Sequence, residues 1–174
     1  MIERLLRARV RQEPFGRTVW LARPGLLVML GPDGRGQVAP SAPFEVHLTI
    51  DGRCRRGCRG CYIDASPDGR DSLPDEYWHN LMARLARAGV LHVALGAGED
   101  TSLERLVGLG REARKLGMVP SLSTSGSSLT PKIAAKLGVF EQVHLNLDGT
   151  AGEWPGNGLP PWPAEKLLAL RIPK

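Results

Sequence analysis

Three positions along the chain repeat one junction, in which a helix-forming stretch meets a glycine and then an apolar run. The junctions are Ala88-Gly89-Val90, Leu116-Gly117-Met118 and Leu137-Gly138-Val139. Glycine commonly ends a helix because it adopts a left-handed backbone without a side-chain clash. Strands joined through helices run parallel, with right-handed crossovers, so their carboxyl ends meet at one edge. The repeat therefore predicts an α/β fold in which the loops after the strands gather at one place.

The repeat divides the chain into three parts. Residues 44–150 are expected to form the core, a partial barrel of about four βα units. Its strands are expected at residues 44–50, 90–95, 118–123 and 143–147. Residues 1–43 are expected to form an accessory segment and a linker. Within this segment we expect a β-hairpin, in which residues 17–22 and 26–30 flank a Pro-Gly turn. Residues 151–174 are rich in proline and predict an irregular tail.

Local signals also place the helix ends. Ser72 with Asp75 resembles a capping box at the start of the first helix, and Pro74 suits its first turn. Thr101 with Glu104 forms a candidate capping pair for the second helix. Thr130-Pro131 is expected to open a short third helix that Gly138 closes.

The cysteines of the chain all lie within eight residues, at Cys54, Cys58 and Cys61. Three thiols cannot all pair in disulfides, and so tight a span does not suit a disulfide framework. Thiolates bind iron–sulfur clusters, so three of them indicate a cluster with one iron open to a small molecule. Two alternatives are a zinc site completed by a histidine and three neighbouring free thiols. The candidate fourth ligand is a histidine on a predicted strand, which His47, His92 and His144 are, whereas His79 lies in a predicted helix.

Four arginines interleave with the cysteines. They are Arg53, Arg55, Arg56 and Arg59. Their charge would offset that of a thiolate-bound cluster or attract an anionic ligand. A solvated basic loop is an equally weighted alternative.

Composition argues against several classes of function. The net charge is +5, but aromatic residues make up only 5% and no basic tract contains aromatic rings, so a nucleic-acid partner is not supported. No apolar run approaches the roughly 18 residues that cross a membrane. The first residues also lack the apolar core of a signal peptide. We therefore expect a cytoplasmic protein with reduced thiols and no membrane association.

The spacing of the cysteines, C-x3-C-x2-C in the loop after the first core strand, resembles the signature of the radical S-adenosylmethionine (SAM) superfamily. In that family the three cysteines hold a [4Fe-4S] cluster, and the open iron binds the amino and carboxylate groups of SAM. The family usually has an aromatic residue just before the third cysteine. Here that position is Gly60, and Tyr62 follows Cys61.

Three later segments extend the resemblance. Gly96-Ala97-Gly98-Glu99 resembles the Gly-Gly-Glu segment that lines the methionine part of SAM, with Glu99 accepting a hydrogen bond from the amino group. The segment from Ser123 to Gly126 resembles a ribose-contacting segment, and the segment from Leu145 to Gly149 resembles the Ser-Leu-Asp-Gly end of the fourth strand. The resemblance thus implies cluster ligands Cys54, Cys58 and Cys61, and SAM contacts Tyr62, Gly96, Ala97, Gly98, Glu99, Ser123, Ser125, Asn146 and Asp148.

The resemblance implies an enzyme that cleaves SAM reductively and abstracts hydrogen with a 5′-deoxyadenosyl radical. The strand ends and the segment from Val10 to Gly16 are similar to radical SAM enzymes that modify peptides, so a peptide or protein substrate and a reductant such as flavodoxin or ferredoxin are expected. The family barrel normally has six strands, so we expect a truncated or frame-disrupted version. The alternatives are a non-catalytic remnant and a zinc-binding module.

Overall fold

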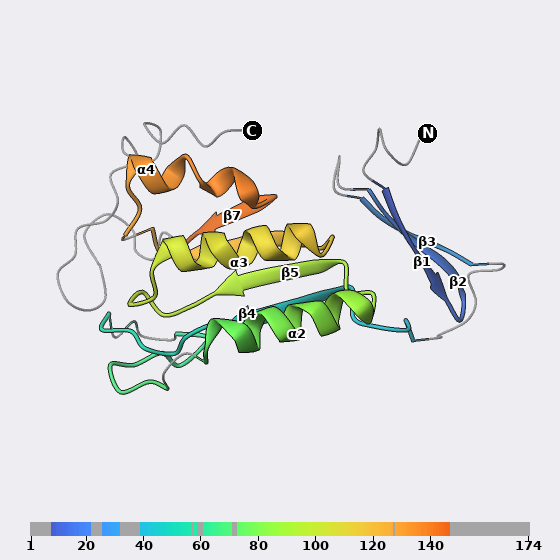
Figure 1. The fold of residues 1–174 in the computed structure, drawn as a ribbon. Helices are drawn as coiled ribbons and strands as arrows, with labels where there is room; N and C mark the ends of the chain where they lie inside the picture. The colour runs from blue at the N-terminus through green and yellow to red at the C-terminus, as the bar shows by residue number, and fades with distance from the viewer. Residues whose placement is uncertain are drawn as a thin grey trace.

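The computed structural model describes residues 8–21, 26–31, 39–56, 58, 61–70, 73–126 and 128–146 (Figure 1). In chain order, its elements are β1 Ala8–Glu13, β2 Gly16–Leu21, β3 Leu26–Leu30, β4 Glu45–Thr49, α2 Asp75–Arg87, β5 His92–Gly96, α3 Leu103–Lys115, β6 Val119–Thr124, α4 Pro131–Ala134, the 3-10 helix η1 Leu137–Val139 and β7 Gln142–Leu145. They form two sheets, one of three strands and one of four. The expected tail at residues 151–174 lies outside the described residues.

The four-stranded sheet is parallel throughout and has the order β4-β5-β6-β7. One register row crosses all four strands, through Leu48, Leu95, Leu122 and Val143. Sequential strands are therefore neighbours, as a βα repeat predicts. The expected α/β fold with a partial barrel of four parallel strands is confirmed.

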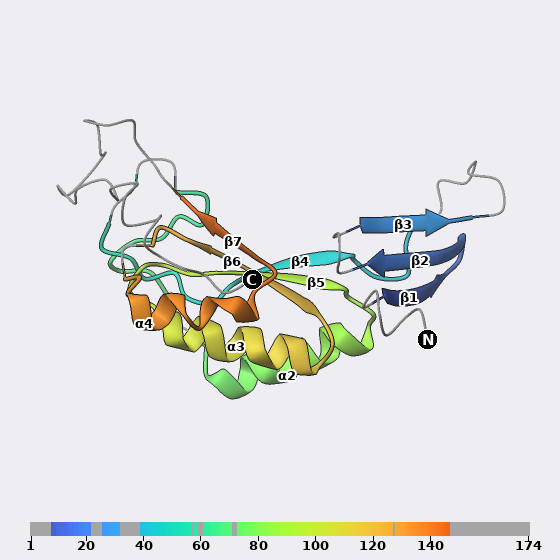
Figure 2. The same cartoon turned by 90° about the horizontal axis from the view of Figure 1, so that it is seen from above.

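The helices α2, α3 and α4 all lie on one face of this sheet (Figure 2). Val93, Leu95 and Leu122 point toward them and are at most 1% exposed. They belong to one core cluster with Met82 of α2 and Val107 of α3. Each buried aliphatic side chain stabilises the fold by about 1.5–3 kcal/mol relative to exposure. This core holds the strands, and thus the loops that follow them, in fixed register.

The glycine junctions behave in two ways. Gly89 and Gly117 have φ of 86° and 83°, so they end α2 and α3 in the left-handed conformation that glycine favours. The same expectation for Gly138 is wrong. Gly138 lies inside η1, because the hydrogen bonds from Lys136 N to Ile133 O (2.8 Å) and from Val139 N to Lys136 O (3.4 Å) continue the turn beyond α4.

The starts of the helices also refine the expectations. α3 is capped by Ser102, whose Oγ accepts a hydrogen bond from Arg105 N at 3.3 Å, so the expected cap at Thr101 is wrong by one residue. Thr130 caps α4 as expected, by accepting from Ile133 N. Ser72 lies outside the described residues, and α2 begins after Pro74 without a side-chain cap.

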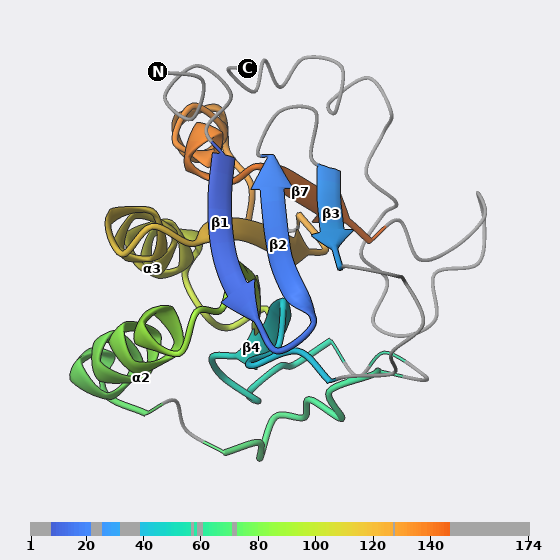
Figure 3. The ribbon, with the colours of Figure 1, turned by 90° about the vertical axis from the view of Figure 1, so that its right-hand side faces the viewer.

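The N-terminal sheet is a three-stranded antiparallel meander, seen face-on in Figure 3. The predicted hairpin is confirmed as the pairing of β2 with β3. The strand β1 was not predicted, because its sequence, Ala-Arg-Val-Arg-Gln-Glu, carries only two apolar side chains. Its alternation places the side chains of Arg9, Arg11 and Glu13 on one face of the sheet.

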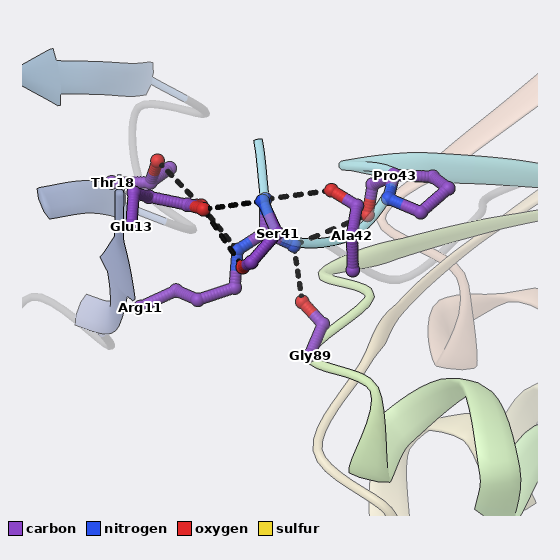
Figure 4. Close-up of polar contacts among 7 residues, drawn as sticks. All are labelled: Arg11, Glu13, Thr18, Ser41, Ala42, Pro43 and Gly89. Carbon is purple, nitrogen blue, oxygen red and sulfur yellow. Dashed lines mark hydrogen bonds and ion pairs between the residues drawn. The ribbon is translucent and has the colours of Figure 1, made fainter. Parts of the chain in front are cut away.

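Arg11 joins this sheet to the core (Figure 4). Its guanidinium donates to Gly89 O at 2.7 Å, Ala42 O at 2.9 Å and Pro43 O at 3.2 Å. It also pairs with Glu13 and lies 4.7 Å from the centre of the Phe44 ring. Both charged side chains are at most 9% exposed, so each needs the other and its polar partners to offset the loss of water.

Glu13 is held by a second set of donors. Its carboxylate accepts from the backbone N and the hydroxyl of Ser41, both at 2.8 Å, and from Thr18 Oγ1 at 3.0 Å. Burial raises the pKa of Glu13, but the hydrogen bonds from Ser41, Arg11 and Thr18 outweigh burial and lower the pKa to about 2.

A second arginine of β1 contacts the next glycine junction. Arg9 lies against Gly117, where a methyl group would approach its Nη1 at 2.7 Å. Burial lowers the pKa of Arg9. A guanidinium group at the carboxyl end of a helix also meets the negative end of the helix dipole. β1 thus places one arginine at the end of α2 and another at the end of α3.

We predict that Glu13→Gln removes an acid-dependent part of the stability. The folded-state pKa of Glu13 lies below the unfolded value of about 4.3, so its contribution is complete above that pH and is lost as the pH falls toward 2. Urea unfolding at several pH values should show a shallower acid dependence for the variant than for the unsubstituted protein. Glu104→Gln, at an exposed position in α3, is the control and should keep the original slope. Equal slopes for the Glu13 variant and the unsubstituted protein would contradict this role.

Candidate cofactor site

The cysteine loop leaves the sheet directly after β4. Ile50 N donates to Gly96 O at 2.8 Å, which continues the pairing with β5 by one residue. The loop is closed by hydrogen bonds from Cys54 N to Ser66 O (2.9 Å) and from Ser66 N to Gly52 O (3.1 Å). Cys54 is therefore held at the edge of the sheet by backbone contacts on both sides.

Asp51 and Gly98 connect this loop to the loop after β5. Gly98 N donates to Asp51 O at 2.8 Å, and the Asp51 carboxylate accepts from Arg53 N at 2.9 Å. A methyl group on Gly98 would overlap the carbonyl oxygen of Arg53 and approach Cys54 Cβ at 3.1 Å. Only glycine permits this approach, so the position of Cys54 depends on the absence of a side chain at Gly98.

The loops surround one pocket of about 230 Å³. Of the residues expected to form the site, ten line it: Cys54, Cys58, Cys61, Tyr62, Ala97, Gly98, Glu99, Ser123, Ser125 and Asn146. Gly96 lines an adjoining hollow, and Asp148 lies outside the described residues. Arg56, one of the four arginines interleaved with the cysteines, also lines the pocket. Sequence reasoning did not select Ile63, Ala65 and Thr124, which complete the lining. Their proximity to the cysteines and to Ser123 along the chain was the available signal.

No disulfide joins the three cysteines to one another, and Cys54 is buried while the other two are partly exposed. Within the described ranges, no three Cys, His, Asp or Glu side chains converge closely enough to form a set of metal ligands. The thiols thus line the pocket without forming a closed ligand set. The lining residues include none of the chain's histidines, so the fourth ligand of a Cys3His zinc site is missing from the pocket.

Glu99 ties the loop after β5 to the loop after β6. Its Oε1 accepts from Ser125 N at 3.0 Å. Gly126 follows with φ of 76°, and its N–H donates to Thr124 Oγ1 at 3.1 Å. The carboxylate of Glu99 is therefore fixed at the pocket wall, where it can accept from a ligand that carries an amino group.

Tyr62 stands between the pocket and the adjoining hollow, since it lines both. A methyl group on Gly96 would come within 2.9 Å of its hydroxyl oxygen. Glycine at the end of β5 therefore leaves room for the phenol ring. Tyr62 is 72% exposed, so a ligand in either space can reach it.

Two of the interleaved arginines lie beside carboxylates. Arg53 Nε is 3.8 Å from Asp51 Oδ1, and Arg55 Nε is 3.3 Å from Asp100 Oδ1. These pairs reduce the net positive charge of the loop. Arg59 lies outside the described residues.

The family model for the radical SAM superfamily matches residues 49–153, which include all of these loops. The chain belongs to the radical SAM superfamily. The range that the family model matches includes all three cysteines.

Curated relatives of this radical SAM chain include two PqqA peptide cyclases. The protein from Rhodopseudomonas palustris is 31% identical over 113 residues, covering 64% of this chain and 30% of the relative. The protein from Ruegeria pomeroyi is 33% identical over 115 residues, covering 63% and 30%. The chain thus matches less than a third of the length of these relatives.

Solved structures with a similar fold include Streptococcus suis SuiB. The structure bound to its precursor peptide SuiA has a TM-score of 0.61 at 14% identity, and the structure bound to S-adenosylmethionine has a TM-score of 0.60. Each match covers 78% of this chain and 45% of SuiB. In the described ranges of this radical SAM chain, none of the helices has the length and apolar character needed to cross a membrane.

We predict that Gly98→Ala displaces the cysteine loop. The added methyl would overlap the Arg53 carbonyl, which should lower the free energy of unfolding by about 1–3 kcal/mol and reduce the iron bound after anaerobic reconstitution. Gly108→Ala is the matched control, because a methyl there meets nothing within 4 Å and lies on a helix. That control should gain about 0.4–1 kcal/mol and keep its iron. Equal iron content in the two variants would contradict the close-approach argument.

Proposed function

We propose that this chain is the cofactor-binding part of a radical SAM enzyme that acts on a peptide. Cys54, Cys58 and Cys61 would hold a [4Fe-4S] cluster, and the loops after β5, β6 and β7 would bind SAM. The observation that carries the proposal is the pocket itself, which the side chains of the three cysteines line together with residues of those loops.

The chemistry of the donor set fits the cluster. Three thiolates can ligate three irons and leave the fourth iron open, whereas a structural zinc ion is bound by four protein ligands. No histidine lines the pocket to supply the fourth ligand. We place the protein in the cytoplasm, a reducing compartment in which thiols persist and can bind metal.

When held by Cys54, Cys58 and Cys61, a reduced [4Fe-4S] cluster would supply the electron for reductive cleavage of SAM. The chain's own residues would bind and orient SAM. The Glu99 carboxylate would accept a hydrogen bond from the amino group, and the backbone at Ala97 and Gly98 would contact the methionine part. Ser123, Ser125 and Asn146, which also line the pocket, would offer polar groups to the ribose. Asp148, which lies outside the described residues, is assigned as a SAM contact on the resemblance alone.

A peptide substrate is supported by the relatives, which are named as peptide cyclases, and by SuiB, whose structure was solved with a precursor peptide. One-electron chemistry also requires a low-potential donor, such as flavodoxin or ferredoxin. This chain matches only 30% of the length of the Rhodopseudomonas palustris relative. The reaction of the whole protein is therefore a proposal, which rests on these cofactor-binding loops.

The decisive test is anaerobic reconstitution with iron and sulfide, followed by incubation with SAM and dithionite. We expect about four irons per chain, a brown protein and 5′-deoxyadenosine among the products. Replacement of all three cysteines by serine should abolish the brown colour and the product. A colourless protein with one zinc per chain would overturn the proposal. A loaded cluster without 5′-deoxyadenosine would instead support a non-catalytic module.

We also predict that Glu99→Gln weakens SAM binding while leaving the cluster in place. The amide oxygen can still accept from Ser125 N, but the charge that attracts an ammonium group is lost. The Kd for SAM should rise about tenfold, since a charge-assisted hydrogen bond is worth about 1.5–3 kcal/mol. Equilibrium binding to the loaded protein measures this change, and iron content is the control. An unchanged Kd would remove Glu99 from the SAM site.

A further inference from the structure

The helices α2, α3 and α4 cover only one face of the parallel sheet (Figure 2). The opposite face carries mainly polar and small side chains. One register row on it runs through His47, Ala94, Ser121 and Gln142. Together with neighbouring rows, these residues line a hollow of about 600 Å³. That volume lies within the range of ligand pockets, roughly 300–1,000 Å³. Apolar and polar side chains alternate along these strands, so one face of the sheet packs in the core and the polar face can contact solvent or a polar ligand.

Glu45 joins two imidazoles at the amino end of this face. Its Oε1 lies 2.7 Å from His47 Nε2, and its Oε2 lies 2.8 Å from His92 Nδ1. Burial raises the pKa of Glu45, but the hydrogen bonds and charge of His92, and then those of His47, outweigh burial and hold the pKa below its ordinary value. The carboxylate is therefore ionised near neutral pH and is fixed from both sides.

Glu45 gives the hollow a negative charge. Among the described residues that line it, Glu45 is the only carboxylate, and no lysine or arginine is present. The Glu45 side chain is 44% exposed, so a ligand can reach it. An ionised carboxylate at an accessible wall favours a cationic partner.

The hollow adjoins the cofactor pocket, because Tyr62, Ser123 and Asn146 line both. Glu45 and Thr49 are the two ends of β4, and Thr49 leads into the cysteine loop. At about 3.3 Å per residue, the strand separates Glu45 from that loop by about 13 Å. An extended peptide of about five residues would span the same distance.

We propose that this hollow receives an extended segment of the peptide substrate, and that the Glu45 carboxylate, braced by His47 and His92, binds a lysine or arginine side chain about four residues from the residue that is modified. This assignment rests on the proposed function and adds a sequence requirement to the substrate. Glu45 acts as a specificity-determining residue, remote from the reacting carbon.

The test uses two dye-labelled, end-capped pentapeptides that consist of alanine except for a single terminal lysine or a single terminal glutamate. Fluorescence anisotropy measures their binding to the cluster-loaded protein with SAM, at one fixed pH for both peptides. The lysine peptide should bind about five- to tenfold more tightly than the glutamate peptide. Lysine would form an exposed ion pair with Glu45, whereas glutamate would place a second negative charge beside it. Glu45→Gln should abolish the difference, and Glu76→Gln, an exposed glutamate on α2, should retain it.

A salt titration of the unsubstituted protein gives a second measurement that does not depend on the folding of a variant. The preference for lysine should shrink as sodium chloride is raised, because an accessible ion pair is screened. Equal binding of the two peptides, tighter binding of the glutamate peptide, or a preference that survives in Glu45→Gln would overturn the proposal. Formation of 5′-deoxyadenosine without peptide is measured separately, so failure of the cofactor chemistry and failure of the Glu45 site give different results.

Discussion

Parallel pairing of β4 to β7 is the constraint on which the other features depend. Because each strand pairs with the next in the chain, the loops that follow them emerge at one edge, with the cysteines on the first. The apolar side chains that fix this register point to the helices, which leaves the other face available for polar groups. One alternation along the strands thus produces both the stable core and the open wall beside the cofactor pocket.

The cysteine loop, the four parallel strands and most helix bounds could be predicted from sequence because their signals are local. Thiol spacing, glycine after a helix and short apolar runs each require only a few neighbouring residues. Gly138 shows the limit of such signals, since the same junction pattern that ends α2 and α3 lies within a 3-10 turn here. Whether a glycine ends a helix depends on the hydrogen bonds on either side of it, which the pattern does not contain.

The features that sequence reasoning missed depend on contacts between distant residues. β1 has little apolar character, and its Arg11 finds a partner 78 residues away at Gly89. Similarly, Glu45 and His92 lie on neighbouring strands, and only the register of β4 against β5 brings them opposite one another. The histidines were considered as zinc ligands, whereas three of the four line the hollow instead of the cysteine pocket. Tertiary pairing therefore assigns these polar residues to a different site.

The close approach at Gly98 fixes the cysteine loop and the loop after β5 relative to each other. The backbone of the loop after β5 lies against that of the cysteine loop, with a hydrogen bond to Asp51 and no space for a side chain between them. The position of Cys54 is thus set as much by β5 as by the strand that precedes it. A cysteine loop transferred alone to another parallel sheet would lack this support, so the transferable unit is the loop together with its neighbouring strand and glycine.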